Sequence, residues 1–68
     1  MKASKRKVQI ARARAGMTIL DIAEKAGLPR ITVSRAANGI SVSPTNFGKI
    51  ARALGVDVTE IIEDEQEE

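Results

Sequence analysis

Glycines interrupt this chain at short intervals and limit every regular element to a short helix. Each of Gly16, Gly27, Gly39 and Gly55 follows a segment in which apolar residues recur at spacings of three and four, the period of one face of an α-helix. No segment has the alternation typical of a strand. We therefore expect helices at about residues 3–15, 19–26, 29–37, 44–54 and 58–62. The predicted fold class is all-α, a compact five-helix bundle.

Capping residues mark the beginnings of three of these helices. In each case a side-chain oxygen is followed by a first-turn proline or by a carboxylate at the spacing of a capping box. The residues concerned are Thr18 with Asp21, Ser43 with Pro44, and Asp57 with Glu60. The third helix begins at Pro29 without such a cap, which costs about 1 kcal/mol relative to a capped helix.

The apolar stripes of these helices supply the predicted core. On the first helix Val8, Ala11 and Ala15 share the inward face. Phe47, the only aromatic residue, is assigned to the core, because proteins that bind single strands interleave several aromatic residues with basic ones. Gly48 lies inside the fourth helix, where glycine is unfavourable, so we expect a neighbouring helix to approach it closely.

The composition argues against most enzymatic functions. The chain contains neither cysteine nor histidine, so disulfides, thiolate zinc sites and the commonest general base are all missing. With 68 residues it has room for one core and for no deep pocket. We expect no enzyme activity, no cofactor, no metal site and no small-molecule ligand. The folded domain is expected at residues 1–62, followed by a frayed acidic tail at 63–68.

Charge is distributed unevenly along the chain. Residues 1–35 carry nine Lys or Arg against two carboxylates, a net +7, whereas residues 36–68 carry two Lys or Arg against seven carboxylates, a net −5. Such a basic half favours nucleic acid or an anionic membrane surface as the partner, with solvated helix faces as the plain alternative. The first helix lacks the large apolar face that enters a membrane. No membrane span or signal-peptide core is visible, so a cytoplasmic location is expected.

Residues 19–38 have the pattern of two helices that cross at a steep angle. The connection is short, and the small residues Ala23 and Gly27 lie where the helices would cross. The side chains expected to face a shared core are Ile22, Ala26, Leu28, Val33 and Ala36. Those expected to face outward are Arg30, Ile31, Thr32, Ser34 and Arg35. This is the arrangement of a helix-turn-helix, whose second helix fits the major groove of DNA.

Two segments resemble a known family. The lambda-repressor-like superfamily has a helix-turn-helix similar to residues 18–39, TILDIAEKAGLPRITVSRAANG. Its Cro/repressor (XRE) branch has fourth and fifth helices similar to residues 50–62, IARALGVDVTEII. The first segment also resembles the headpiece of lactose-repressor-type regulators. We favour the XRE branch, because here a basic helix precedes the motif and the second segment follows it.

The resemblance implies which residues contact DNA. Arg30, Ile31 and Arg35 match positions that contact bases, and their chemistry agrees, because arginine holds guanine O6 and N7 in a bidentate pair and isoleucine packs on a thymine methyl group. Backbone or secondary contacts are expected, some through helix N-terminal amides, from Lys5, Lys7, Arg12, Thr18, Ile19, Thr32, Ser34, Asn38, Ser43, Thr45 and Asn46. For Ser34 and Asn38 a purely structural role at the helix end stays equally open.

The chain departs from the family pattern at two positions that affect this site. Gln often begins the second helix and contacts DNA, but here Ile19 occupies that position. A Glu usually precedes the Asn-Gly pair and meets the arginine of the first helix, but here that residue is Ala37. Arg12 is therefore expected to be available for a phosphate.

These features predict a sequence-specific transcriptional regulator of double-stranded DNA, a repressor that acts as a homodimer on a two-fold operator. Dimerisation is expected because one helix reads only a few base pairs and the last segment holds more apolar residues than one short helix needs. The residues assigned to the dimer interface are Val56, Val58, Ile61 and Ile62. Two alternatives stay open: a protein-interaction module such as an antitoxin or adaptor, and an architectural or excision-type factor that bends DNA.

Overall fold

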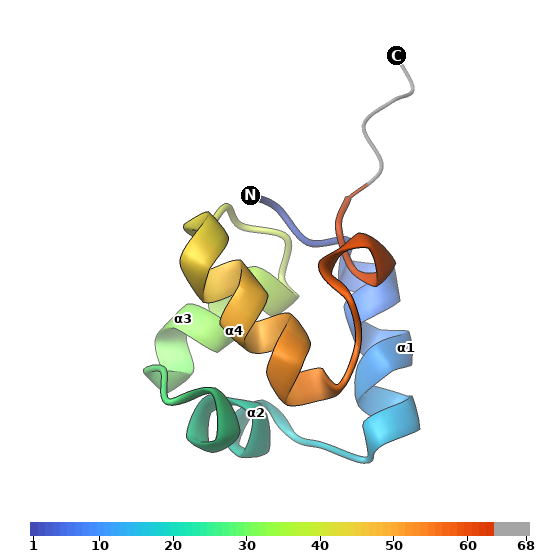
Figure 1. The fold of residues 1–68 in the computed structure, drawn as a ribbon, viewed down its shortest axis with the longest axis vertical. Coiled ribbons are helices and arrows are strands. Elements are labelled where there is room, and N and C mark those ends of the chain that lie inside the picture. Colours follow the sequence, from blue (N-terminus) through green and yellow to red (C-terminus); the bar gives the residue numbers. More distant parts are fainter. Residues whose placement is uncertain (64–68) are drawn as a thin grey trace.

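The computed structural model describes residues 1–63 and consists of four short α-helices followed by a single 3-10 turn (Figure 1). These elements are α1 (Lys5–Ala15), α2 (Ile19–Ala26), α3 (Arg30–Ala37), α4 (Pro44–Leu54) and η1 (Val58–Glu60). The all-α class is confirmed, but the expectation of five helices is wrong. The predicted acidic tail, apart from Glu63, lies outside the described residues.

The expected fifth helix is cut short by pairing between the two ends of the described chain. Its start is as predicted, since Asp57 and Glu60 form a capping box. After one turn, however, Ile62 forms an antiparallel bridge with Ala3, and the Ile61 carbonyl accepts a hydrogen bond of 2.8 Å from the Ser4 amide. The Ile61 carbonyl is thus bonded to the N-terminal segment and not to a following helical turn, so the helix does not continue past Ile61.

Asp57, the capping residue of η1, has a lowered pKa. The hydroxyl and the amide of Thr59 both donate to the Asp57 carboxylate, and these hydrogen bonds lower the pKa of Asp57 below its ordinary value. The side chain is exposed, so this shift reflects local capping of the turn.

The same end pairing moves the start of the first helix. Ser4 caps α1 by accepting a bond from the Lys7 amide, so the helix begins two residues later than expected. Ala3 lies in the bridge and is buried. Val8 and Ala11 face the core as predicted, but Ala15 is exposed, so its assignment to the inward face is wrong.

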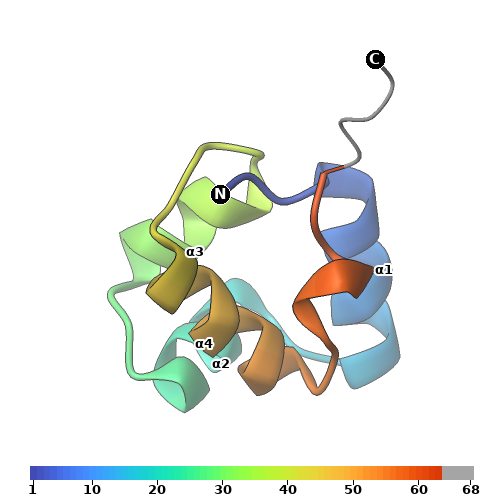
Figure 2. The same ribbon diagram turned by 45° about the horizontal axis from the view of Figure 1, so that its top comes forward.

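The N-terminal segment joins two parts of the fold that are distant in sequence. Figure 2 shows it running between the 38–43 loop and the C-terminal segment. The Val42 amide donates to the Met1 carbonyl at 2.8 Å, and the Glu63 amide donates to the Lys2 carbonyl at 3.0 Å. The N-terminal segment thereby links the end of the loop before α4 to the last residue that the structure describes.

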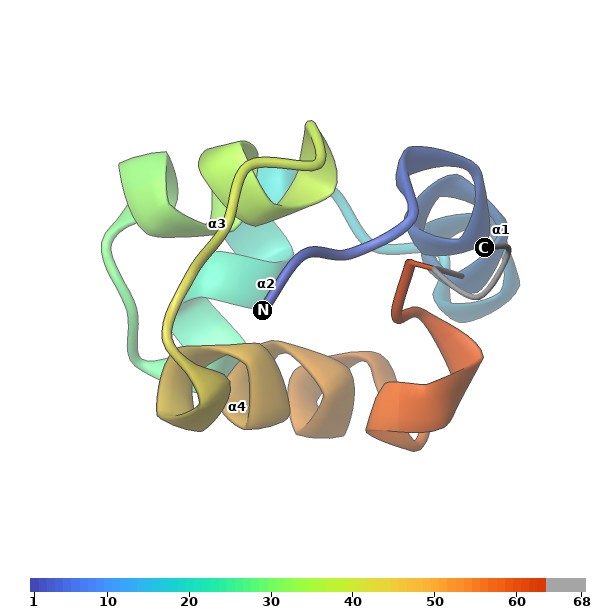
Figure 3. The ribbon, with the colours of Figure 1, turned by 90° about the horizontal axis from the view of Figure 1, so that it is seen from above.

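The core lies where α2 packs between α3 and α4 (Figure 3). Phe47, Ile22 and Ile61 are completely buried there, and Val33 is nearly so, which confirms the assignment of Phe47 to the core. No polar or charged side chain is buried among residues 1–63. The domain is therefore held together by apolar packing, and its polar groups are left for caps and for its surface.

Gly48 contradicts its predicted role. A Cβ atom placed on Gly48 would meet no heavy atom within 4 Å, so close helix packing does not require glycine at this position.

The substitution Gly48→Ala is therefore expected to stabilise the domain by about 0.5–1 kcal/mol, because alanine loses less backbone entropy in a helix. Urea denaturation followed by circular dichroism would measure this change. Gly55→Ala is the matched control. Gly55 has a φ of 77°, where an alanine is strained, so the same measurement should show a loss of stability. A loss for Gly48→Ala as well would contradict the assignment of open space.

Candidate nucleic-acid interface

The turn between α2 and α3 gives the helix-turn-helix its angle. Gly27 ends α2 with a φ of 71°, and the amides of Gly27 and Leu28 donate to the Ala23 carbonyl at 2.9 and 3.0 Å. Ala23 is buried, as expected of a residue at the crossing. A Cβ on Gly27 would meet nothing within 4 Å, however, so the expected packing role of this glycine is wrong. Glycine is needed there for its left-handed backbone conformation.

The two faces of α3 divide as predicted. Val33 and Ala36 are buried against the core, whereas Arg30, Ile31 and Arg35 are exposed. Ile31 is 58% exposed, an unusual position for a large apolar side chain on an otherwise anchored helix. In Figure 3 the outer side of α3 faces away from α4, with α2 between the two. The outer face of α3 therefore carries two basic side chains and one apolar side chain, all exposed to solvent.

Three of the predicted contact residues lie together on this face. Arg30, Ile31 and Ser34 line a shallow hollow of about 360 Å³. Thr32 and Ser34 are half-buried at the margin of the face. An arginine beside an exposed isoleucine combines a bidentate donor with an apolar contact, the two groups that distinguish guanine and thymine in the major groove.

The N-terminus of α2 is less suited to phosphate than expected. Thr18 and Asp21 form a complete capping box, in which the Asp21 carboxylate accepts from the Thr18 amide at 2.9 Å. This carboxylate places a negative charge at the end of the helix and repels a phosphate. Ile19 is half-buried against the core, so its side chain contributes to packing.

The N-terminus of α4 is the better phosphate site. Ser43 caps it by accepting from the Asn46 amide at 3.2 Å, and its hydroxyl proton is left to donate. The first turn of α4 contains no acidic residue, and Thr45 is exposed beside the cap. The helix dipole there favours an anion.

Three other predicted phosphate contacts bond to the protein's own backbone. Arg12 Nε donates to the Met17 carbonyl at 3.2 Å, so the expectation that Arg12 is unengaged is wrong. Lys7 Nζ donates to the Ile62 carbonyl at 3.3 Å. Asn38 Nδ2 donates to the Ser34 carbonyl at 2.9 Å and closes the end of α3, while the left-handed residue is Gly39. These bonds favour the structural interpretation of Asn38.

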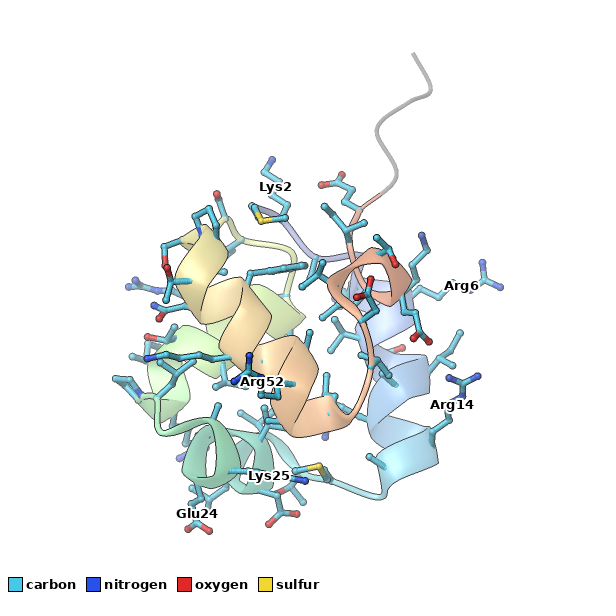
Figure 4. All side chains as sticks on the ribbon, in the orientation of Figure 1. Lys2, Arg6, Arg14, Glu24, Lys25 and Arg52 are labelled. Atoms are coloured by element: carbon cyan, nitrogen blue, oxygen red, sulfur yellow. The ribbon has the colours of Figure 1, made fainter. Side chains whose placement is uncertain are left out.

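The basic residues of α1 do not form one surface with α3. Figure 4 shows Arg6 and Arg14 extending from the side of α1 that faces away from α3. Arg14 lies 3.6 Å from the Glu60 carboxylate, in an exposed ion pair. Lys5 is exposed near the start of α1. The positive charge of the first half of the chain is thus divided between two sides of the domain.

One polar residue near the candidate interface was missed from the sequence. Gln9 lines a surface hollow of about 320 Å³ together with Arg12 and Thr18, where α1 meets the beginning of α2. Gln9 lies one turn before Arg12, and this spacing, which is visible in the sequence, places the two side chains on one face of the helix.

The residues predicted to form the dimer interface also pack within their own chain, and the interface itself stays a prediction. Ile61 is completely buried, and Val56, Val58 and Ile62 are half-buried and pack against the same core. The apolar residues of the last segment are therefore used within one chain. They replace the packing that a longer fifth helix would have supplied.

Two other kinds of site are absent from the described part of the chain. Between residues 1 and 63 no three acidic side chains cluster in a way that could hold a metal ion. None of the helices in this part of the chain has the length and apolar character needed to cross a membrane. The surface of α3 therefore stands out by its chemistry rather than by any deep cavity.

Comparison with known proteins agrees with this geometry. No curated protein and no solved structure matches the chain. A family model described as helix-turn-helix matches residues 8–61, which is most of the chain and includes α2, α3 and α4 in full. The chain therefore belongs to the XRE-type, Cro/repressor-like helix-turn-helix family of DNA-binding transcriptional regulators.

Proposed function

We propose that this protein is a sequence-specific repressor that acts as a homodimer on a two-fold DNA operator. The observation that carries the proposal is the exposed group of Arg30, Ile31 and Arg35 on a helix whose opposite face is buried in the core. The buried opposite face fixes the position of the α3 backbone, so the helix itself needs no ordering when its side chains meet base edges.

In this proposal α3 enters the major groove with its N-terminal turns foremost. Arg30 and Arg35 donate to guanine O6 and N7, and Ile31 packs on a thymine methyl group. Ser43, Thr45 and the first amides of α4 hold a phosphate and fix the register of α3 along the groove. Repression follows from occupation of the operator, which excludes the polymerase.

The homodimer follows from the size of the reading surface. One short helix covers only a few base pairs, too few for a unique operator, and two-fold pairing doubles the sequence that is read. The two copies of α3 would then contact half-sites about 34 Å apart, one turn of DNA.

Selection of bound duplexes from a random library tests this proposal directly. We expect a two-fold symmetric consensus whose half-sites are about 10 base pairs apart from centre to centre. The selected and random duplexes are then compared over a series of salt concentrations. Both affinities should fall by about 0.9 log units per phosphate neutralised for each tenfold rise in salt concentration. The selected site should still bind more tightly than random DNA.

The other outcomes of this experiment identify different functions. Binding without preference among sequences would indicate an architectural factor that bends DNA. The absence of duplex binding at moderate salt would indicate a protein-interaction module. An asymmetric consensus would support sequence-specific binding but would contradict the proposed homodimer.

A further inference from the structure

The edge of the domain formed by α1 and η1 carries basic and apolar groups that the proposed DNA contact does not use. The helices α1 and α3 contact each other, but the outer side of α1 faces away from α3 (Figures 1 and 3). Arg6 and Arg14 extend from the far side of α1 (Figure 4), so they point away from a duplex held by α3. Their charge therefore requires another explanation.

A groove runs along this edge between α1 and residues 56–60. Its volume is about 280 Å³, and its apolar lining comes from Ile10, Ala11 and Val56. Ile10 is 49% exposed and is the only large apolar side chain of α1 that is exposed. Because Ile10 lines a groove together with Ala11 and Val56, it offers an apolar contact to a partner that enters the groove.

The charged residues of this edge are arranged regularly around Ile10. Arg6 and Arg14 stand four residues before and after it, so the three side chains lie along one stripe of the helix. Arg14 is paired with Glu60 across the groove at 3.6 Å, but both side chains are at least half exposed. An exposed pair of this kind is weak and exchanges readily for another carboxylate.

We propose that this groove binds an acidic helical peptide segment of a partner protein. A bulky apolar side chain of the peptide packs on Ile10 and Val56, and carboxylates one turn to either side of it pair with Arg6 and Arg14. A second copy of this chain fits less well, because α1 against α1 would bring like charges together. Nucleic acid fits less well too, because phosphates leave Ile10 without an apolar contact.

The inference goes beyond the proposed function, since a regulator held on DNA by α3 would keep this edge accessible. The partner would be recruited to the operator, or would modulate the bound protein, without competing for α3. Binding of DNA and binding of the peptide are therefore expected to be independent.

The test uses a synthetic helical peptide of about 15 residues with a central leucine and a glutamate four residues to either side of it. The full chain, labelled with ¹⁵N, is titrated with this peptide and followed by NMR. We expect shifts concentrated at Ile10, Arg14, Val56 and Thr59. Two control peptides replace the leucine by alanine or the glutamates by glutamine; the alanine peptide should bind about tenfold more weakly and the glutamine peptide severalfold more weakly.

Matched variants of the protein complete the test. Ile10→Ser should weaken the peptide about tenfold and Arg14→Ala about two- to fivefold, whereas Ile40→Ser and Arg52→Ala, at exposed positions outside the groove, should not weaken it. Circular dichroism checks that all four variants fold. Ile10→Ser should leave affinity for the selected duplex unchanged, so a failure of the groove and a failure of the DNA contact are distinguishable.

Three results would overturn the inference. Equal binding of the leucine and alanine peptides would show that the peptide is held by unspecific charge attraction and not by apolar packing on Ile10 and Val56. Concentration-dependent shifts of the groove residues without any peptide would assign the edge to a second copy of the chain. Displacement of the peptide by a duplex would make the edge part of the DNA surface.

Discussion

Replacing Phe47 by alanine is expected to leave most of the protein unfolded at room temperature. Phe47 is completely buried, and removal of such a side chain costs about 3–5 kcal/mol through lost apolar contact and the cavity that remains. In a chain of 68 residues a single core rarely supplies more than about 3–5 kcal/mol of net stability, so this loss is as large as the stability itself. Thermal melts followed by circular dichroism would measure the effect.

The control for this experiment is Phe47→Leu, which keeps most of the buried volume. It should cost less than about 1.5 kcal/mol and preserve a cooperative transition. A folded Phe47→Ala variant with an unchanged melting temperature would show that Phe47 of α4 is not a central residue of the core.

Removing the two exposed arginines of α3 is expected to have the largest effect on DNA binding. Arg35→Ala and Arg30→Ala should each weaken the selected site by about 1–3 kcal/mol, or about 5- to 150-fold, because each deletes one bidentate contact to guanine. Random duplexes should lose much less, since base contacts contribute little to unspecific binding. Electrophoretic mobility shifts or fluorescence anisotropy at fixed salt would give both affinities.

Arg52→Ala is the matched control for these variants. Arg52 lies on α4, on the side of the domain away from α3 (Figure 4), so its removal should change selected and random duplexes equally and weakly. If Arg35→Ala reduced binding to every sequence by the same factor, Arg35 would be a phosphate contact and the assignment of α3 as the reading helix would fail.

Local features of the sequence predicted most of the fold. The positions of α2, α3 and α4 follow from apolar spacing and from capping residues such as Thr18 and Ser43, whose effects act within one helical turn. The same reasoning placed Val33 inside and Ile31 outside on α3. Periodicity is enough here, because one face of each short helix meets the only core that the chain possesses.

Features that depend on contacts between distant segments were not predictable in this way. The fifth helix was lost to backbone bonds between Ser4 and Ile61, residues at opposite ends of the described chain. Arg12 was expected to be unengaged because its usual carboxylate partner is replaced by Ala37, but it bonds to the Met17 carbonyl instead. Main-chain acceptors leave no trace in the residue pattern, so such partners become visible only in three dimensions.

The glycines show a different limit. The sequence correctly placed Gly27 at the end of a helix, but it could not separate a need for space from a need for backbone freedom. The φ of 71° at Gly27 and the open surroundings of Gly48 decide between these causes. One glycine is required by conformation, whereas packing does not require the other.

The bond from the Ser4 amide to the Ile61 carbonyl has a consequence for the order of folding. It closes a loop of nearly the whole described chain, and the entropy of closing such a loop is recovered only once the intervening helices have collapsed. We therefore expect the helices to assemble before the ends join. Because Ile61 enters the core from this junction, its opening transiently uncovers the apolar interior while α2 and α3 keep their crossing.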